Sequence, residues 1–194
     1  TEACICCADT LEEVNKLVMA IAKPIIEKHT QTDPNMKVEV LGCDGIQKCM
    51  NDESTKKIID TLYSLPEGVQ KMSEDVEGLV QTSLNMGILV TNDTDVKMSY
   101  CVRSSVDSEK AELLSILKKK MSEVGGKLST IGDYPGWEYM KESPLRNLMI
   151  DLYKKQYGKE PVIEAIHAGV ECGMFAGKLP GLDCVSYGPD LSEI

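Results

Sequence analysis

The order of periodic segments between residues 36 and 134 constrains the fold of this chain more than any other feature. Alternating apolar and polar residues predict strands, whereas apolar residues that recur every three or four positions predict helices. In chain order the pattern predicts a strand at 37–41, a helix at 52–64, strands at 79–91 and 95–104, a helix from 107 or 108 to 123, and a strand at 127–131. This β-α-β-β-α-β order is that of a ferredoxin-like sandwich, so the sequence predicts an α+β fold.

The segments before and after this unit do not fit inside it. Residues 2–9 are typical of a strand, Thr10 and Glu13 form a capping box that opens a helix reaching about residue 28, and residues 65–78 are polar and predict a loop. After residue 137 the pattern becomes α-β-α-β, with a helix at 144–157, a strand at 162–167, a helix at 170–176 and a strand at 182–187. Two such strands do not make a covered sheet, so we expect an internal piece of a longer protein.

Charge and hydropathy exclude two classes of partner. The chain has 31 acidic and 21 basic residues, and its net charge of −10 repels phosphate backbones, so nucleic acid is not expected to bind. No apolar run reaches the roughly 20 residues that cross a bilayer, and the first residues lack the pattern of a signal peptide. We therefore expect neither membrane association nor secretion.

Cysteine placement indicates the cellular compartment. Cys4 and Cys6 alternate along an apolar stretch, and Cys101, Cys172 and Cys184 also lie in apolar segments. We expect most of the eight cysteines to be buried thiols in a reducing, cytoplasmic compartment, with a cysteine zinc cluster as the less favoured alternative.

Five runs carry a resemblance to a known family. They are AIHAGVECGMF at 165–175, LDCVSYGPD at 182–190, VQTSLN at 80–85, YCVRS at 100–104 and YPGW at 134–137. The chain resembles the aminoacyl-histidine dipeptidases (Xaa-His dipeptidases of the peptidase D type), which are grouped with carnosinase and peptidase T as di-zinc metallopeptidases. The resemblance implies a lid and dimerisation domain at 1–137 and part of an α/β zinc-peptidase catalytic domain at 138–194.

The resemblance also implies an activity and its cofactor. The full-length enzyme would hydrolyse dipeptides with two zinc ions, held by histidines and carboxylates of the catalytic domain, and would be a homodimer formed through its lid. The His-x-Asp and Glu-Glu ligand motifs are expected outside this sequence. We therefore expect no metal ligand and no catalytic residue here, and no activity from this piece alone.

Two candidate substrate-binding residues lie on the predicted strands of the lid. Arg103 is expected on the same side of its strand as Cys101, and the resemblance implies that it grips the C-terminal carboxylate of the substrate; a solvated arginine on an open sheet face is the alternative. Asn85, beside Gly87, would hydrogen-bond substrate by resemblance, or would mark a bulge or strand end.

Three further candidates follow a strand of the catalytic segment, where α/β enzymes place ligand contacts. Gly169 would let substrate approach the backbone, His167 would contact substrate or be a hydrogen-bonded core histidine, and Glu171 would contact substrate or cap the short helix. Two rival functions stay open: a stand-alone ferredoxin-like module that binds a small ligand, and a purely structural dimerisation module.

Overall fold

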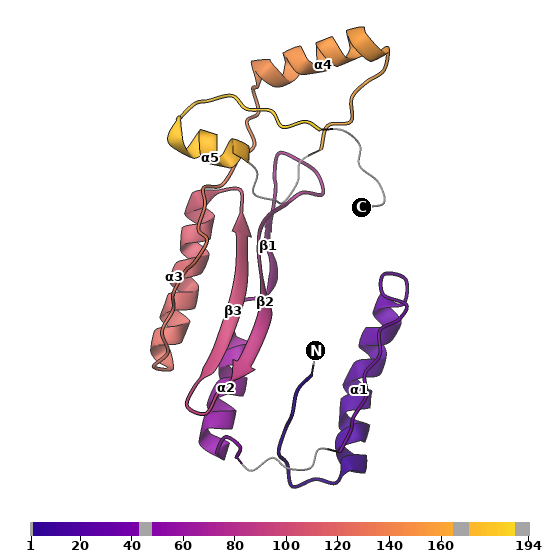
Figure 1. Ribbon diagram of the computed structural model, residues 1–194, viewed down its shortest axis with the longest axis vertical. Coiled ribbons are helices and arrows are strands. Elements are labelled where there is room, and N and C mark those ends of the chain that lie inside the picture. Colours follow the sequence, from indigo (N-terminus) through magenta and orange to yellow (C-terminus); the bar gives the residue numbers. More distant parts are fainter. Residues whose placement is uncertain (1, 43–47, 165–170, 189–194) are drawn as a thin grey trace. The chain divides into compact units, whose positions relative to one another are not determined.

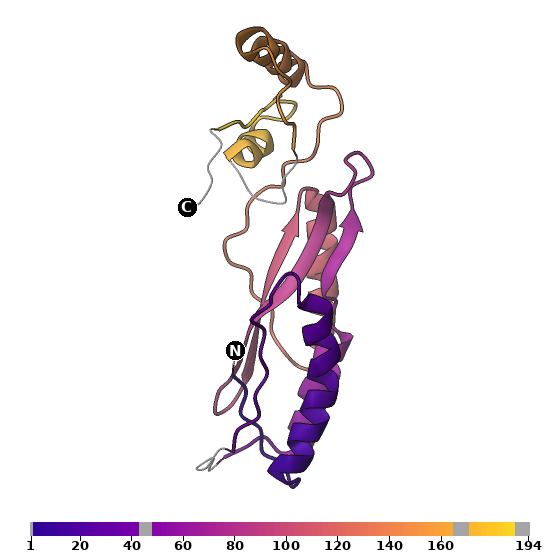
Figure 2. The same ribbon diagram turned by 90° about the vertical axis from the view of Figure 1, so that its right-hand side faces the viewer.

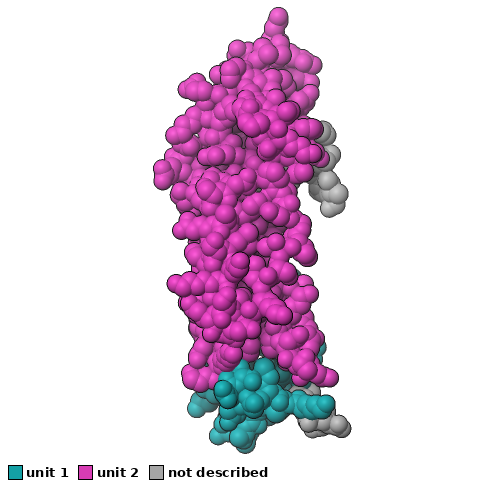
Figure 3. Space-filling view, turned by 90° about the vertical axis from the view of Figure 1, so that its left-hand side faces the viewer, with its two compact units in different colours: residues 1–55 teal, residues 56–194 magenta. Residues whose placement is uncertain are grey.

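The computed structural model describes residues 2–42, 48–164 and 171–188 of the chain. The chain divides into two compact units, Thr1–Thr55 and Lys56–Ile194 (Figure 3). The first unit is centred on a helix and the second on an antiparallel sheet. The predicted boundary between residues 137 and 138 remains a prediction.

The first unit contains helix α1, Leu11–His29, and its start is confirmed as a capping box. The Glu13 N–H donates to the Thr10 hydroxyl at 3.3 Å, while the Thr10 N–H donates to the Glu13 carboxylate at 2.9 Å. These bonds satisfy two backbone donors that the helix itself leaves open. The apolar stripe of α1 is largely uncovered, since Leu17 is 63% and Ile21 is 68% exposed.

The second unit is built around an antiparallel sheet. Helix α2, Asp52–Ser64, leads into strands β1 (Gly68–Met72), β2 (Val80–Thr91) and β3 (Val96–Ser104), which neighbour one another in that order within the described residues. Helix α3, Asp107–Glu123, then runs along one face of the sheet (Figures 1 and 2). A turn in which the Asn92 N–H donates to the Asp95 carbonyl joins β2 to β3, as the sequence predicts.

The core of this unit lies between α3 and the sheet. Leu84 of β2, which is 1% exposed, packs with Leu65 and with Leu113 and Leu117 of α3. Partly buried side chains complete the cluster: Met98, Tyr100, Val102, Met121 and Leu128. Because strand side chains alternate between faces, the residues that lie between these on the paired strands, such as Ser83, Asn85, Cys101 and Arg103, project from the opposite face of the sheet.

Strand prediction fails where pairing depends on distant residues. Four segments expected to be strands are coil in the described chain: 2–9, 37–41, 127–131 and 182–187. The expected loop at 65–78, in contrast, contains β1. A strand exists only when a neighbour accepts its hydrogen bonds, and Leu41 and Ile131 are 77% and 96% exposed. The described chain is thus a mixture of helices and one antiparallel sheet, as expected, but the ferredoxin-like order is not observed in it.

The C-terminal helices are confirmed. Helix α4 spans Pro144–Tyr157, and helix α5 spans Glu171–Lys178. The buried Ser143 caps α4, and the Asp183 carboxylate accepts from its hydroxyl at 2.6 Å and from the Leu145 N–H at 2.8 Å. Asp183 thereby attaches residues around 183 to the start of α4, although this segment is not a strand. The expected strand at 162–167 is coil at 162–164, and its remainder lies outside the described residues.

The expectation of buried cysteines is wrong for most of the described ones. Five of them are exposed: Cys4, Cys6, Cys7, Cys49 and Cys101. Cys172 and Cys184 are partly buried. The physical reason is local, because residues 2–9 form no strand and residue 101 lies on the sheet face opposite α3.

Candidate substrate-binding face

The open face of the β2–β3 hairpin brings the two lid candidates together. Ser83 pairs with Arg103, and Asn85 pairs with Cys101, in the antiparallel register. Both pairs lie between rungs whose side chains face the core, so all four residues project from the face opposite α3. Asn85 and Arg103 are diagonal neighbours, with Cα atoms roughly 7 to 8 Å apart in such a register. We call these four residues the open-face cluster.

Arg103 lies on the same side of β3 as Cys101, as predicted. Its Nε donates to the Cys101 Sγ at 3.5 Å, and its side chain is exposed. The pKa of Arg103 is raised, first by this hydrogen bond to Cys101, while burial opposes the shift. The guanidinium is therefore a permanent cation on a paired strand, and its planar fork suits a carboxylate.

Asn85 is paired in the regular register, with Cys101, and a bulge follows two residues later, so Asn85 is not itself the bulge residue. The register shifts between Met86 and Ile88, so Gly87 is the extra residue. The Met86 N–H donates to both carboxylate oxygens of Glu67, at 3.1 and 3.2 Å. A bulge re-aims the side chains beside it and is common next to binding sites. Asn85 itself is exposed on the open face and presents both a donor and an acceptor.

The loop 133–137 closes against the end of this hairpin. The Gly136 N–H donates to Asp107 at 2.8 Å, and a Cβ at Gly136 would collide with the Ser105 carbonyl oxygen. Lys110 pairs with Asp133 at 2.8 Å and donates to the Tyr134 carbonyl at 2.5 Å. The loop is therefore held at the start of α3, directly after β3.

Helix α5 packs on the same loop through two glycines. A Cβ at Gly177 would lie 2.7 Å from both Cβ and Cγ of Pro135, and one at Gly173 would lie 3.1 Å from the Pro135 carbonyl oxygen. Real Cβ atoms essentially never come within 3.0 Å of another atom, so the Pro135 ring leaves no room for a side chain at Gly177, whereas at Gly173 the neighbour would have to move by a few tenths of an ångström. Glycine at these two positions therefore allows α5 to lie directly against residue 135.

Of the remaining predicted residues the structure describes only Glu171, which is not part of the open-face cluster. Glu171 is exposed and is the first residue of α5, where its negative charge interacts favourably with the helix dipole. His167 and Gly169 lie outside the described residues. Sequence reasoning missed Ser83 and Tyr134, because the first requires the register of β2 against β3 and the second requires the folding of loop 133–137.

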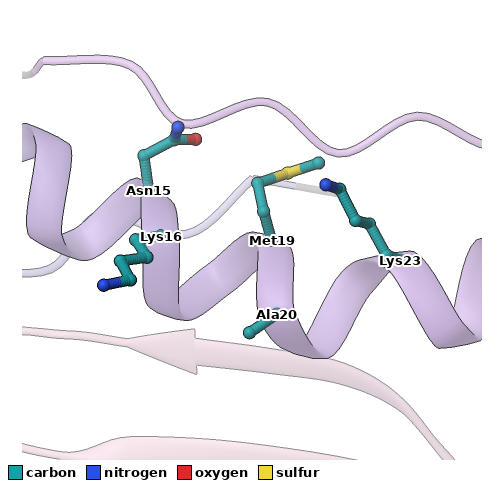
Figure 4. A pocket seen from close by; sticks show the side chains of 5 residues that line it. All are labelled: Asn15, Lys16, Met19, Ala20 and Lys23. Carbon is teal, nitrogen blue, oxygen red and sulfur yellow. The ribbon is translucent and has the colours of Figure 1, made fainter.

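Neither an enclosed pocket nor a metal site accompanies the open-face cluster in the described residues. A shallow hollow is lined by Asn15, Lys16, Met19, Ala20 and Lys23 of α1. Figure 4 shows these side chains pointing to different sides of the helix, so they do not converge on a ligand. No group of three or more His, Cys, Asp or Glu side chains in the described ranges is placed to bind a metal ion. Among the described helices, none has both the length and the apolar character needed to cross a membrane.

Comparison with known proteins gives the open-face cluster a context. The sequence is 30% identical over 185 residues to the cytosol non-specific dipeptidase of Escherichia coli (strain K12). The matched region covers 95% of this chain and 38% of that protein. The fold matches the crystal structure of aminoacylhistidine dipeptidase from Vibrio alginolyticus with a TM-score of 0.81 and 29% identity, covering 92% of this chain and 36% of that one. No protein-family model matches the sequence.

The chain is related to the aminoacyl-histidine dipeptidases. The resemblance inferred from the five sequence runs is thereby confirmed, and it extends over nearly the whole chain. This chain spans somewhat more than a third of the length of these dipeptidases. Two of the predicted site residues, Asn85 and Arg103, are on strands that the structure describes, β2 and β3.

Proposed function

We propose that this chain is part of a zinc-dependent dipeptidase that hydrolyses dipeptides of the Xaa-His type. Residues 1–137 would belong to its lid and residues 138–194 to its catalytic domain. The observation that carries the proposal is the open-face cluster, in which Arg103 and Asn85 lie on adjacent strands of a chain related to dipeptidases.

The chemistry of a dipeptide explains the proposed role of Arg103. A dipeptide carries a free carboxylate one residue beyond the bond that is cleaved, and an enzyme that selects dipeptides needs a fixed cation at that distance. Arg103 supplies a planar donor fork from a paired strand. Asn85 would hydrogen-bond the substrate nearer its peptide bond, where an amide can both donate and accept.

The metal chemistry would fall to other residues. The described residues do not fit a zinc ion, since no group of three or more possible ligands comes together in them. We therefore assign the binding and orientation of substrate to the described residues of this chain, and the metal ligands to other residues of the full-length enzyme. His167, Gly169 and Glu171 would contact substrate from the catalytic segment, and they stay predictions.

Three other features complete the proposal. The name of the Escherichia coli relative supports a cytoplasmic location. The full-length enzyme would be a homodimer through its lid, because large apolar side chains of α1 are exposed in this chain. The lid would also gain two strands when residues 37–41 and 127–131 find partners, which would give the ferredoxin-like order with β1 as an additional strand.

The deciding experiment uses the full-length protein that contains this chain. We would measure kcat/KM for an Xaa-His dipeptide and for its C-terminal amide, in the wild type and in Arg103→Ala. Charge-assisted hydrogen bonds contribute roughly 1.5 to 3 kcal/mol, so we expect kcat/KM for the dipeptide to fall about 10- to 150-fold, with little change for the amide. Arg103→Lys should recover little, because a point charge does not reproduce the fork.

Two outcomes would contradict the proposal. A full-length protein with no dipeptide hydrolysis would favour a stand-alone ligand-binding or dimerisation module. An Arg103→Ala variant that prefers acid over amide as strongly as the wild type would show that Arg103 is a solvated strand residue. Lys97→Ala is the matched control, since it removes another cation from the same face of β3 near the hairpin turn.

A further inference from the structure

A polar network on the core side of the sheet lies next to the rung that holds Arg103. Its centre is Glu109, in the first turn of α3, whose side chain is 17% exposed. One carboxylate oxygen, Oε1, accepts from Lys71 Nζ of β1 and from Gln81 Nε2 of β2, both at 2.7 Å. The other, Oε2, accepts a short hydrogen bond from the Thr82 hydroxyl of β2.

The network continues from Glu109 to β3. Thr82 is 2% exposed, and its Oγ1 lies 2.7 Å from the Ser104 Oγ. A hydroxyl has one proton, and Thr82 gives its own to Glu109, so the proton of Ser104 is shared between two acceptors, the Thr82 oxygen and the Val106 carbonyl oxygen at 2.9 Å. Ser104 also accepts from the Val106 N–H at 3.0 Å, which connects β3 to the start of α3. A single carboxylate therefore ties all three strands to the helix.

The position of this network relates it to substrate recognition. Thr82 pairs with Ser104, and the next rung pairs Ser83 with Arg103. The network thus fixes the backbone one residue from Arg103 on β3 and one residue from Ser83 on β2. Burial raises the pKa of Glu109, but the hydrogen bonds from Lys71, Thr82 and Gln81 outweigh it and lower the pKa overall. The carboxylate is ionised at neutral pH and holds its partners by charge-assisted bonds.

We propose that Glu109 is a positioning residue for recognition of the substrate carboxylate: through Thr82 and Ser104 it holds the β2–β3 rung from which Arg103 projects. This inference rests on the proposed dipeptidase function. Glu109 lies on the core side of the sheet and Arg103 projects from the open side. Glu109 therefore orients the Arg103 side chain only through the strand backbone. A tie of this kind matters because small displacements of a binding group reduce the rate of an oriented reaction.

The test uses Glu109→Gln in the full-length protein. The variant keeps the size of the side chain. Its amide nitrogen is a donor, however, so it cannot accept the hydrogen bonds that one of the carboxylate oxygens accepts in the wild type. We expect the ratio of kcat/KM for an Xaa-His dipeptide to that for its C-terminal amide to fall about threefold to tenfold. KM for the dipeptide should rise, and KM for the amide should stay unchanged. If the role of Glu109 were purely structural, the variant would lower kcat/KM equally for both substrates, or would lower only the thermal stability.

Two further variants make the result decisive. Glu112→Gln removes the same charge from an exposed position of α3 and should leave the ratio unchanged. Thr82→Val keeps the shape of a buried side chain but interrupts the network between Glu109 and Ser104, so it should lower the ratio even if Glu109→Gln does not fold.

The comparison with Arg103→Ala separates the two levels of the proposal. If Arg103→Ala does not change the acid-to-amide ratio, the carboxylate clamp itself is wrong and the role of Glu109 is lost with it. If Arg103→Ala lowers the ratio while both Thr82→Val and Glu109→Gln preserve it, the clamp stands and the positioning role of Glu109 is overturned.

Discussion

At the scale of single residues, three positions favour glycine because a neighbouring residue leaves little room for a side chain. Gly136, Gly173 and Gly177 each lie where a Cβ would meet the backbone or the ring of a neighbouring residue. None of the three has the left-handed backbone conformation that usually explains a glycine. Their common reason is the close approach of α5, loop 133–137 and the end of β3.

Gly177→Ala tests this interpretation directly. Alanine is favoured over glycine inside a helix by about 1 kcal/mol, so the substitution would stabilise α5 if space allowed it. Because the new Cβ would lie 2.7 Å from Pro135, we expect instead a net loss of about 1 to 2 kcal/mol in the free energy of unfolding. Urea denaturation of the chain measures it.

A matched control is available at Gly188, where an added Cβ meets nothing within 4 Å. Gly188→Ala should leave the free energy of unfolding nearly unchanged. A Gly177→Ala variant that is as stable as the wild type would show that α5 does not pack on Pro135 in solution.

At the scale of elements, α3 is the helix that organises the sheet. Its apolar face supplies Leu113 and Leu117 to the core, and its first turn supplies Asp107 and Glu109 to two polar contacts. The hydrogen bond from the Gly136 N–H is the main reason that the pKa of Asp107 is lowered. Burial opposes this lowering of the pKa, and Lys110 adds to it. Helix α3 therefore connects loop 133–137 and all three strands from one end.

This arrangement predicts a pH dependence of stability. Asp107 and Glu109 both have lowered pKa values in the folded chain. Their contribution to the free energy of unfolding is therefore complete above about pH 5, where both are ionised in the folded and in the unfolded state. It is lost as the pH falls below about 4, through the lowered pKa values of the folded state. Urea midpoints between pH 3 and pH 6 should therefore fall with acid, and less steeply in Glu109→Gln. An unchanged slope in that variant would contradict the prediction.

At the scale of the whole molecule, much apolar surface of the chain remains uncovered. Leu41, Ile131 and Val162 are 77%, 96% and 84% exposed, and all three lie in segments that were expected to be strands. Soluble proteins rarely expose large apolar patches without a partner. This agrees with the proposal that such segments pair with other parts of a longer dipeptidase, or with a second copy.

The proposal also predicts the behaviour of the chain when it is purified alone. We expect residues 1–194 to retain no stoichiometric zinc after dialysis and to hydrolyse no dipeptide, because the described residues do not assemble a set of metal ligands. Metal analysis and a dipeptide assay measure both properties, with the full-length protein treated identically as the control. One tightly held zinc ion per chain would show that the ligands are present in this chain after all.

The sequence alone was sufficient for features that depend on neighbours in the chain. The capping box at Thr10, the bounds of α2 and α4, the β2–β3 hairpin and the shared side of Cys101 and Arg103 were all predicted, because helix periodicity, caps and alternation are local properties. The resemblance to dipeptidases was likewise inferred from short runs of residues.

Only the tertiary structure decided what depends on residues far apart. It made β1 a strand and left 37–41 and 127–131 as coil, since a strand requires a partner that no local pattern specifies. It also set the register that places Asn85 diagonal to Arg103, and it joined Glu109 to three strands. The candidate residues could thus be named from the sequence, but their common face and the network behind it arise from pairing and packing across the chain.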